Sequence, residues 1–476
     1  MNVLDRIVAE RKRRIAALGH SIGAAVPPVR TAPLVQFGAD PFLICEIKRR
    51  SPSKGDIAPA VDAVGRARAY ADRGIRNVSV LTEWDNFGGS LEDLIQIKKA
   101  LPHIAVLRKD FLLDEEDIEI SWRAGADAVL LIASILDGGR LAALHRRARG
   151  LGLQVLVEAH SEEDVGRCRV FAPELTGINS RDLSTFSVDL LHPFALKGRI
   201  DWRTRLVFES GITSSEDVLL ALSGGFDGVL VGEAAMRSPE SVPPLLEAFG
   251  QKPGDFWPRL YFRKKPGRPL VKVCGITRPE DAEAGASLGA DALGFVFAPS
   301  KRRASSKLLE DLRPLRIPKV AVVVTSRVGD CLRLDHEVRD LLERGLVDAV
   351  QFHGDEAPEE CAPMAFPYYK AVRIRGAADV EKIGRYRCPR VLADAYSADA
   401  SGGTGQIIPR HLALEAKNLR PLWLAGGIGP DNVGEILREL RPELIDASSR
   451  LEESPGKKDG ARLSRFFEEI ERNEEV

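Results

Sequence analysis

The sequence is poor in the residues that build disulfide and metal sites. Its 476 residues include only 6 cysteines, scattered without CxxC or CxH spacing, which argues against a disulfide framework and a zinc site. Neither half contains a dinucleotide-binding fingerprint, a metal-ligand cluster or a nucleophile elbow. We therefore expect no cofactor and no metal, and reduced thiols of the kind found in the cytoplasm.

The sequence also lacks an excess of one charge and long apolar runs. It has 68 basic and 69 acidic residues, so no general positive field attracts nucleic acid or a membrane. No apolar run approaches the ~20 residues of a membrane span. The first 18 residues are amphipathic and contain Asp5 and Glu10, unlike a secretory or transit signal. We expect a cytoplasmic protein that binds neither nucleic acid nor membranes; a monomer is compatible with the sequence, which does not set the oligomeric state.

The sequence does contain a regular alternation of short apolar runs and helical stretches. Eight runs in the first half span residues 42–48, 77–83, 104–110, 128–134, 154–160, 175–181, 205–211 and 228–234. Eight more in the second half span residues 270–276, 292–298, 319–324, 349–354, 368–374, 390–396, 422–428 and 444–449. Their continuous apolar character is typical of parallel strands that are covered on both faces.

Two sets of eight βα units predict an α/β protein with two tandem (β/α)8 TIM barrels and an extra N-terminal helix. We expect barrels at residues 1–250 and 270–476, and a Pro-, Gly- and base-rich linker at residues 251–269. The alternative is a pair of open doubly wound sheets. Those usually have about five or six strands and a Gly-rich turn after the first one, whereas here the Gly-rich turns fall late in each half.

The same strand, Gly-Ile turn, helix and strand occur late in both halves. A step of 21 residues separates Gly211 from Gly232, and the same step separates Gly427 from Ser448. TIM barrels often bind phosphate after strands 7 and 8, at the N-terminus of a short helix. The repeat therefore predicts one phosphate site in each barrel. The alternative is that these glycines only form tight turns.

Charged and polar residues stand at the C-terminal ends of the predicted strands, where TIM barrels carry their chemistry. In the first half these residues are Glu46, Lys48, Lys109, Asp110, Glu158, Asn179, Arg181, Glu209 and Ser210. Because desolvating charges is costly, the group favours acid–base chemistry on a phosphorylated substrate over a rim of salt bridges. Neighbouring lysines are expected to lower one another's pKa.

The second half carries a different set at its strand ends. They are Cys274, Arg302, Gln351, His353, Asp394 and the glycines of residues 401–405. A single cysteine is usually a small buried hydrophobe, and a single histidine is usually structural. The residues alone therefore leave the roles of Cys274 and His353 open.

The longer motifs resemble two families of tryptophan biosynthesis. EIKRRSPSKG (46–55), VLRKDFLL (106–113), LVEAH (156–160), GINSRDL (177–183) and FESGI (208–212) resemble indole-3-glycerol phosphate synthase. KVCGIT (272–277), DALGFVF (291–297), VQFHG (350–354), SGGTG (401–405), LAGGI (424–428) and SSRLEESPGKKD (448–459) resemble phosphoribosylanthranilate isomerase. The order of the two halves resembles that of fused bifunctional enzymes.

The synthase resemblance implies ring closure of a carboxyphenylamino-deoxyribulose phosphate, with loss of CO2 and water. It implies Lys109 as general acid and Glu158 as general base, assisted by Glu46 and Lys48; which lysine serves which step stays open. The implied substrate-binding residues are Ser51, Phe87, Phe111, Asn179, Arg181 and Glu209. The implied phosphate-binding residues are Ser210, Gly211, Gly232 and Glu233.

The isomerase resemblance implies an Amadori rearrangement of N-(5'-phosphoribosyl)anthranilate, with Asp394 as acid and Cys274 as base. It implies that Arg302 grips the anthranilate carboxylate, with Arg303 as the alternative, and places His353 among the substrate-binding residues. Phosphate contacts are implied for Gly403, Gly427, Ser448 and Ser449. Arg450 and the stretch after Gly405 depart from the family pattern.

The resemblance implies small phosphorylated anthranilate derivatives as the ligands, and consecutive reactions in the two barrels. Two alternatives stand beside it. One barrel is a scaffold for the other, or the second barrel is a histidine-pathway sugar-phosphate isomerase, which has an aspartate where Cys274 stands. Both halves keep every acid–base position that the two reactions need, which favours the bifunctional interpretation.

Overall fold

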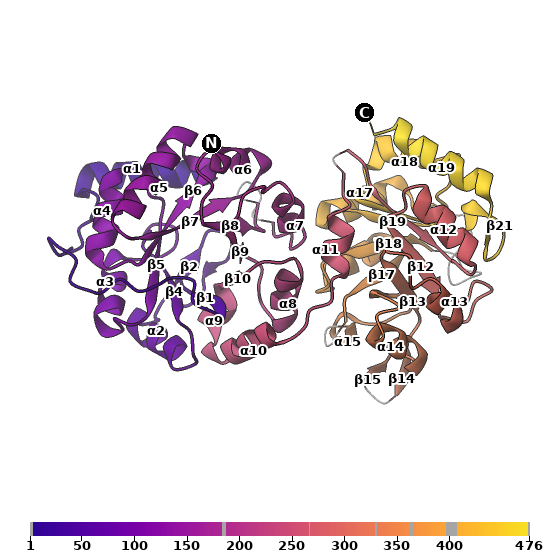
Figure 1. Cartoon of the computed structure of the whole chain (residues 1–476), viewed down its shortest axis with the longest axis horizontal. Coiled ribbons are helices and arrows are strands. Elements are labelled where there is room, and N and C mark those ends of the chain that lie inside the picture. The colour runs from indigo at the N-terminus through magenta and orange to yellow at the C-terminus, as the bar shows by residue number, and fades with distance from the viewer. Residues whose placement is uncertain are drawn as a thin grey trace. The chain divides into compact units, whose positions relative to one another are not determined.

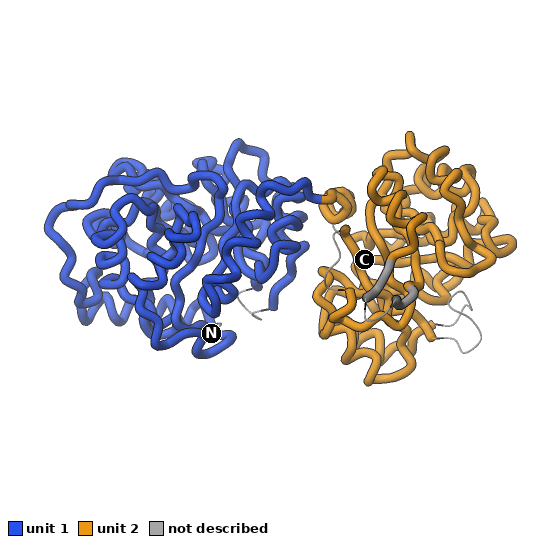
Figure 2. The backbone as a smooth tube through the Cα atoms, turned by 90° about the horizontal axis from the view of Figure 1, so that it is seen from below, with its two compact units in different colours: residues 1–253 blue, residues 254–476 orange. Residues whose placement is uncertain are grey.

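The computed structural model describes residues 3–182, 187–265, 267–328, 331–361, 366–396 and 407–474. The chain divides into two compact units, Met1–Pro253 and Gly254–Val476 (Figure 2). Each unit contains a closed barrel of eight parallel strands, which confirms the two predicted TIM barrels and rules out open sheets. Within the described ranges, no helix combines the length and apolar character that crossing a membrane requires.

The first barrel follows the βα order predicted from the apolar runs, with helices around the strands (Figure 1). Its strands are β1 (Phe42–Ile47), β4 (Asn77–Leu81), β5 (Ala105–Lys109), β6 (Ala128–Ile132), β7 (Gln154–Ala159), β8 (Leu175–Asn179), β9 (Arg205–Glu209) and β10 (Gly228–Val231). Strand β10 closes the barrel by pairing with β1. The predicted runs are one to three residues longer than the strands, because they include turn residues that are buried or half-buried.

The helices of this unit are α1 (Val3–Leu18), α2 (Ala63–Ala71), α3 (Leu91–Ala100), α4 (Glu115–Ala124), α5 (Gly138–Gly150), α6 (Glu162–Arg169), α7 (His192–Lys197), α8 (Ser215–Ser223), α9 (Glu233–Arg237) and α10 (Val242–Glu247). Helices α4, α6 and α8 each begin with a capping box, in which an acidic side chain at N3 satisfies backbone N–H groups at the helix start. The turns that lead from the strand ends into these helices are thereby held in place.

Residue alternation along each strand sorts the first barrel's interior into an apolar base and a charged top. Ile44, Leu107, Leu156 and Val207 are buried in one core cluster. Two residues further along the same strands stand Glu46, Lys109, Glu158 and Glu209. Because side chains two apart on a strand share a face, all four charged groups point into the barrel at its C-terminal end.

The N-terminal helix α1 packs onto that core. Ile7 is buried in the cluster that fills the barrel, and Val3, Leu4 and Val8 pack against it. The apolar side of the amphipathic pattern at residues 3–18 therefore covers the barrel rather than facing solvent.

The second barrel repeats the architecture. Its strands are β11 (Leu270–Cys274), β12 (Ala292–Val296), β13 (Lys319–Val323), β16 (Ala349–Phe352), β17 (Tyr368–Ile374), β18 (Val391–Ala395), β19 (Trp423–Ala425) and β20 (Leu444–Ala447). Its helices are α11 (Phe256–Tyr261), α12 (Pro279–Ser287), α13 (Ser306–Asp311), α14 (His336–Glu343), α15 (Pro358–Cys361), α16 (Ala377–Ile383), α17 (Arg410–Leu419), α18 (Val433–Leu440) and α19 (Gly460–Arg472). Short hairpins pair β14 (Ser326–Val328) with β15 (Cys331–Arg333) and β21 (Glu452–Ser454) with β22 (Lys457–Lys458).

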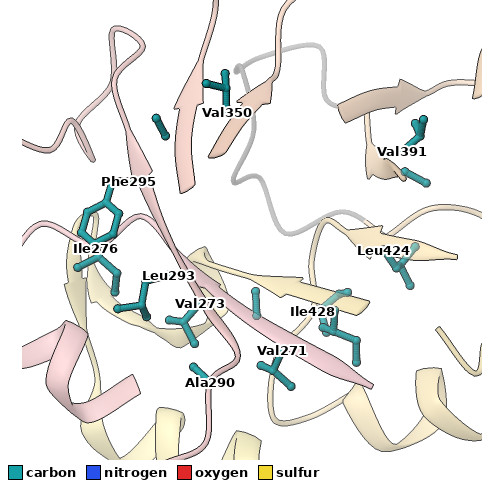
Figure 3. Packing of buried hydrophobic residues seen from close by; sticks show 14 of the residues in the cluster. Val271, Val273, Ile276, Ala290, Leu293, Phe295, Val350, Val391, Leu424 and Ile428 are labelled. Atoms are coloured by element: carbon teal, nitrogen blue, oxygen red, sulfur yellow. The ribbon is translucent and has the colours of Figure 1, made fainter. Parts of the chain in front are cut away.

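Alternation also sorts the second barrel. Val271, Val273, Leu293 and Phe295 belong to the cluster between the strands and the helices (Figure 3). The intervening residues of β11, including Lys272, therefore face the interior.

The segment expected to be a linker contributes to the second unit. Helix α11 lies inside residues 251–269, and its Phe256 and Trp257 are buried. Trp257 packs 5.9 Å from the ring of Trp423, and Phe256 stacks 6.4 Å from Tyr369. The Pro and Gly composition of the segment hid a short aromatic helix that is stabilised by this tertiary packing.

Candidate active sites

A cavity of about 490 Å³ opens at the C-terminal end of the first barrel. Predicted residues that line it are Glu46, Lys48, Ser51, Phe87, Lys109, Phe111, Glu158, Asn179, Arg181, Ser210, Gly211, Gly232 and Glu233. Glu209 completes the predicted set by bonding to Lys109 beneath the cavity. The structure therefore brings all the residues singled out in the first half to one place.

Lys109 is the centre of the cavity's charged floor. Its Nζ lies 2.8 Å from Glu209 Oε2, 3.6 Å from Glu46 Oε2 and 3.7 Å from Glu158 Oε2. Burial alone would lower the pKa of Lys109, but the three carboxylates hold it well above its usual range. The expectation that neighbouring lysines lower one another's pKa is thus wrong for Lys109, because carboxylates from β1, β7 and β9 surround it.

The pKa values of two of these carboxylates are shifted in opposite directions. Burial alone would raise the pKa of Glu158, but Lys109 and a 2.7 Å contact with His160 Nε2 hold it well below its usual range. Burial, with Glu158 close by, raises the pKa of Glu209 even though Lys109 opposes the shift. The lowered pKa keeps Glu158 ionised, as a group that accepts a proton must be. No hydrogen-bond donor reaches its Oε2 within the described part of the chain.

Glu46 and Lys48 form a second pair beside Lys109. Lys48 Nζ lies 2.5 Å from Glu46 Oε1. A Cβ at Gly232 would lie 2.8 Å from the same Oε1 and 3.2 Å from the same Nζ. Gly232 therefore leaves the space that this pair occupies, in addition to any part it plays in anion binding.

Phe87 and Phe111 line the cavity next to each other. Their ring centroids are 6.2 Å apart and their planes are tilted by 35°. Both pack in or against the apolar core cluster that includes Leu130 and Ile132. A planar aromatic substrate group fits this apolar part of the cavity.

The two glycine turns share one backbone geometry. Ser210 and Gly211 are both left-handed, with φ of 67° and 78°, and Gly426 and Gly427 repeat this with 92° and 62°. At the second turn of each unit, Gly232 precedes α9 with ψ of −84°, and Ser448 precedes a 3-10 turn, η4 (Ser449–Leu451), with ψ of −88°. Matching turns at matching places support a common backbone device, such as an anion site.

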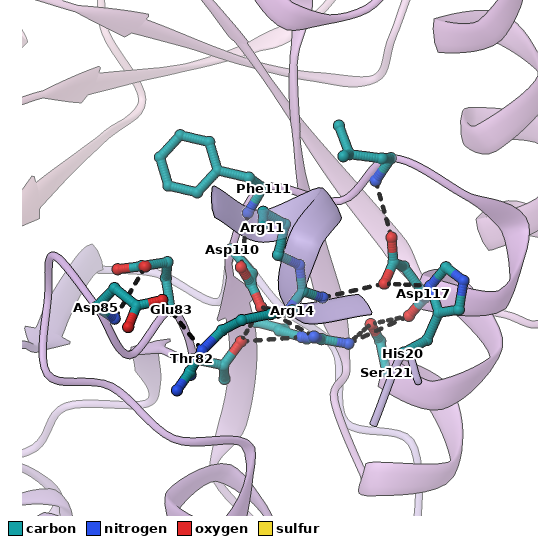
Figure 4. Close-up of polar contacts among 12 residues, drawn as sticks. Arg11, Arg14, His20, Thr82, Glu83, Asp85, Asp110, Phe111, Asp117 and Ser121 are labelled. Atoms are coloured by element: carbon teal, nitrogen blue, oxygen red, sulfur yellow. Dashed lines mark hydrogen bonds and ion pairs between the residues drawn. The ribbon is translucent and has the colours of Figure 1, made fainter. Parts of the chain in front are cut away.

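Helix α1 is tied to the strand that carries Lys109 through a buried polar network (Figure 4). Arg11 lies 3.6 Å from Asp110 Oδ2 and 3.0 Å from Asp117 Oδ1. Asp110 also accepts from Thr82 and Arg108, and its other oxygen accepts from the Phe111 amide. The residues on both sides of Asp110 are thereby fixed, and Val3, Leu4 and Ile7 of α1 line the cavity.

In the second barrel, Cys274 ends β11 and Asp394 lies on β18, three strands away around the barrel. His353 Nε2 lies 3.0 Å from Asp394 Oδ2, and its Nδ1 accepts from Gln351 at 2.9 Å. A Cβ at Gly426 would lie 3.1 Å from Asp394 Oδ1, so this glycine leaves space beside the carboxylate. Cys274 and Asp394 thus stand on different sides of one barrel mouth.

Arg302 and Arg303 point to different places. Arg302 binds Glu452 through three contacts of 2.8–3.0 Å, and its Cδ would lie 2.9 Å from a Cβ at Gly275, next to Cys274. Arg303 instead binds Glu337 on α14 at 2.7 Å. The geometry favours Arg302 as the arginine of the site.

Residues of the motif at 448–459 contact the end of β11 at Cys274. Ser448 Oγ donates to the Cys274 carbonyl at 3.0 Å. Lys458 donates to the same carbonyl at 2.6 Å and lies 3.1 Å from Glu452. Arg450, which departs from the family pattern, packs on Gly429, where a Cβ would lie 2.7 Å from the Arg450 Cβ.

Several functional candidates were missed by the sequence reasoning. His160 contacts Glu158, and the signal for it was its place two residues further along the same run. Lys272 and Asp446 form a buried pair; the motif KVCGIT begins with Lys272, but no motif contained Asp446. Gly403 lies outside the described residues, so the structure does not place that predicted phosphate contact.

Two other features lie away from the predicted sites. A cavity of about 750 Å³ in the second unit is lined by residues such as Phe297, Arg303 and Leu334, and its lining does not include Cys274 or Asp394.

Ligand atoms of His20, Asp114 and Asp117 lie close enough to hold a metal ion. The Arg11 guanidinium already places a positive charge 3.0 Å from Asp117 there, which disfavours a cation.

Comparison with known families agrees with the two-barrel division. Residues 4–243 match the family model of indole-3-glycerol phosphate synthase, and residues 271–469 match that of N-(5'phosphoribosyl)anthranilate isomerase. A multifunctional tryptophan biosynthesis protein of Phycomyces blakesleeanus is 30% identical over 98% of this chain and 69% of its own length. An indole-3-glycerol phosphate synthase of Geobacillus thermodenitrificans is 38% identical over 53% of this chain and 99% of its own.

The solved phosphoribosyl anthranilate isomerase of Thermus thermophilus is 34% identical and covers 43% of this chain and 98% of its own, with a TM-score of 0.38. The chain spans about two thirds of the length of the multifunctional relatives, 69% for the one from Phycomyces blakesleeanus and 66% for one from Schizosaccharomyces pombe.

Proposed function

The chain belongs to the family of bifunctional tryptophan-biosynthesis enzymes that join an indole-3-glycerol phosphate synthase domain to a phosphoribosylanthranilate isomerase domain, and on this basis we propose which residues carry each reaction. Matches to both families favour two activities over a scaffold barrel or a histidine-pathway isomerase.

In the first barrel, Lys109 is the general acid and Glu158 the general base. The supporting observation is the Lys109 ammonium among three carboxylates, which keeps it protonated at neutral pH. It donates to the carbonyl oxygen of the deoxyribulose phosphate as the ring carbon attacks that carbonyl. The C–CO2 bond then breaks, its electrons restore the benzene ring, and CO2 leaves. Lys48 or Lys109 protonates the hydroxyl formed from the carbonyl, which departs as water, and Glu158, held ionised, takes the proton from the neighbouring carbon to give the aromatic indole.

The remaining cavity residues hold the substrate. Phe87 and Phe111 receive the anthranilate ring on the apolar side of the cavity. Asn179, Arg181 and Ser51 bind polar groups beside it, and Glu46 with Lys48 assists proton transfer. The backbone amides that follow Ser210 and Gly232 bind the phosphate, with Glu233 at the start of α9.

In the second barrel, Asp394 and Cys274 carry the rearrangement. Asp394 protonates the ribose ring oxygen, the ring opens, and the anilino nitrogen's electron pair forms the C1=N bond. Cys274 as thiolate takes the C2 proton, the electrons of that C–H bond form the C1=C2 enolamine, and tautomerisation gives the aminoketose. Arg302 binds the anthranilate carboxylate, and His353 orients Asp394.

The phosphate of that substrate is bound by backbone groups at Gly427, Ser448 and Ser449, together with the predicted contact at Gly403. The shared geometry of the two glycine turns supports this assignment. No step in either mechanism calls for a metal or cofactor, because side-chain acids and bases supply the proton transfers and the substrate's own ring and nitrogen supply the electron pairs.

We further propose that the enzyme works in the cytoplasm on small phosphorylated anthranilate derivatives. Cys45, Cys168, Cys274, Cys361 and Cys388 are buried free thiols, as a reducing compartment permits. The balanced net charge of −1 supports neither nucleic-acid nor membrane binding. A monomer is sufficient for the proposed chemistry, since each site is assembled within one barrel.

Two reciprocal variants test these assignments in one polypeptide. Lys109→Met should lower synthase kcat/KM by about 10²–10⁴ and leave the isomerase unchanged. Cys274→Ser should do the reverse. Each unaffected barrel serves as the folding control for the other. Loss of both activities in either variant, with both barrels still folded, would mean that the two sites are not separate.

A further inference from the structure

The interior of the second barrel holds a lysine that the mechanism above does not use. Lys272 lies on β11, two residues before Cys274, and is 1% exposed. Its Nζ donates to Asp446 Oδ2 at 2.6 Å and to Gln351 Oε1 at 2.7 Å. Burying a lysine ammonium costs free energy, which these two partners offset. The position of the pair beside the proposed base suggests that it has a role there.

The ammonium and the proposed base lie beside the same glycine. A Cβ at Gly294 would lie 2.6 Å from Cys274 Sγ and 3.0 Å from Lys272 Nζ. Both side chains therefore occupy the space that the missing Gly294 side chain leaves open. Any larger residue at position 294 on β12 would push the thiol and the ammonium away.

The charge balance around Cys274 depends on Lys272. The facing groups are Lys272 on β11, Asp446 on β20, Asp394 on β18, Gln351 and His353 at the end of β16, Tyr369 on β17, Lys458 on β22, and Arg302 with its partner Glu452. Burial raises the pKa of the Cys274 thiol, and Lys272 is the strongest influence that opposes the rise. Burial would lower the pKa of Lys272 itself, but Asp446 holds it well above its usual range, so the ammonium stays charged.

Resting on the assignment of Cys274 as the isomerase base, we propose that Lys272 is a positioning residue for it. The buried ammonium compensates the negative charge of the Cys274 thiolate and, through Gln351 and Asp446, links the base to the His353–Asp394 side of the mouth. Lys272 does not exchange a proton with the substrate. Its contribution is to keep Cys274 able to release and regain a proton near neutral pH in a buried site.

The same network extends through Tyr369 to helix α11. Tyr369 donates from its hydroxyl to Gln351 Oε1 at 2.9 Å, and its ring stacks on Phe256 of α11. Gln351 Oε1 therefore accepts hydrogen bonds from both Tyr369 and Lys272. A fixed Gln351 in turn donates to His353, the residue next to Asp394.

The direct test is the pH dependence of Cys274 alkylation in the full chain. The Cys274 peptide is followed by mass spectrometry during reaction with iodoacetamide. In Lys272→Met, the midpoint of the alkylation rate should move up by at least one pH unit, and isomerase kcat should fall at least tenfold. Synthase kinetics should stay within twofold of the wild type.

Lys370→Met is the matched control. Lys370 is a buried lysine of the same barrel, 2% exposed and 3.3 Å from Glu356, and it has no contact with Cys274. Its replacement should leave the alkylation midpoint unchanged even if the barrel loses stability. An unchanged midpoint in Lys272→Met would overturn the proposal and reduce Lys272 to a structural residue.

A second variant guards against simple misfolding. Lys272→Met leaves Asp446 unpaired, whereas Lys272→Met/Asp446→Asn removes both charges together. The double variant should keep the alkylation midpoint above that of the wild type and below that of the single variant; a midpoint equal to that of the wild type would refute the proposal.

Cys274→Ser tests the assigned base separately from the role of Lys272. Retained isomerase activity in that variant would refute Cys274 as the base whatever Lys272 does.

Discussion

Gly177 offers the most sensitive test of the first site, because its missing side chain is what lets Glu209 reach Lys109. A Cβ at Gly177 would lie 2.0 Å from Glu209 Oε1, 3.1 Å from Glu209 Cδ and 3.4 Å from Leu156 Cδ1. Carbon and oxygen do not approach to 2.0 Å without bonding, so Gly177→Ala must displace the carboxylate. The displacement breaks the 2.8 Å contact between Glu209 and Lys109.

The energetic cost has two parts. Overpacking in a filled interior costs about 1–3 kcal/mol, and a hydrogen bond to a charged group is worth about 1.5–3 kcal/mol. We expect Gly177→Ala to destabilise the first barrel by about 2.5–6 kcal/mol. A shift of about 1 Å in Lys109 should lower synthase kcat/KM by about 10²-fold.

The assay measures synthase and isomerase kinetics on the same preparation, with hydrogen exchange of β8 and β9 peptides as the stability readout. Gly166→Ala is the matched control: Gly166 lies within α6 with no atom near its would-be Cβ, and the change should stabilise by about 0.5–1 kcal/mol. Isomerase activity should be unaffected by either change. Synthase activity within twofold of the wild type in Gly177→Ala would refute the claim that Glu209 positions the Lys109 ammonium.

Three further changes probe other parts of the two sites. His160→Ala removes one of the contacts that hold the pKa of Glu158 low, so the acid limb of the synthase pH–rate profile should shift to higher pH; an unmoved limb would mean that Glu158 does not set it. Arg302→Met should raise isomerase KM at least tenfold and Arg303→Met less than threefold, and reversed effects would reassign the carboxylate contact. Ser210→Gly relieves a left-handed backbone and should keep synthase KM within threefold, whereas Gly211→Ala, whose Cβ would lie 2.6 Å from Leu190, should raise it at least tenfold; similar values for both would argue against phosphate binding by the backbone of this turn.

Much of the architecture was readable from periodicity. The predicted strands form the two barrels because continuous apolar runs of six to seven residues, separated by helices, leave few other solutions. The charged residues at the strand ends meet in one cavity because alternation places Glu46, Lys109, Glu158 and Glu209 on the same face as the apolar residues two positions earlier.

Features that depend on contacts between distant residues were not readable in this way. The rise in the pKa of Lys109 arises from carboxylates on three other strands, and sequence neighbours gave the wrong direction. Helix α11 is short and lies among prolines and glycines, and only its packing on Trp423 and Tyr369 identifies it as part of the second barrel. Lys272 looks like one polar residue in a strand until Asp446, 174 residues away, is seen beside it.

Both barrels of this chain are expected to carry working sites, and their reactions are consecutive. The most direct test gives the purified protein freshly generated phosphoribosylanthranilate alone and follows the products by mass spectrometry. Indole-3-glycerol phosphate should form, with release of CO2. Accumulation of the aminoketose without indole-3-glycerol phosphate, or no product above the uncatalysed control, would contradict this expectation.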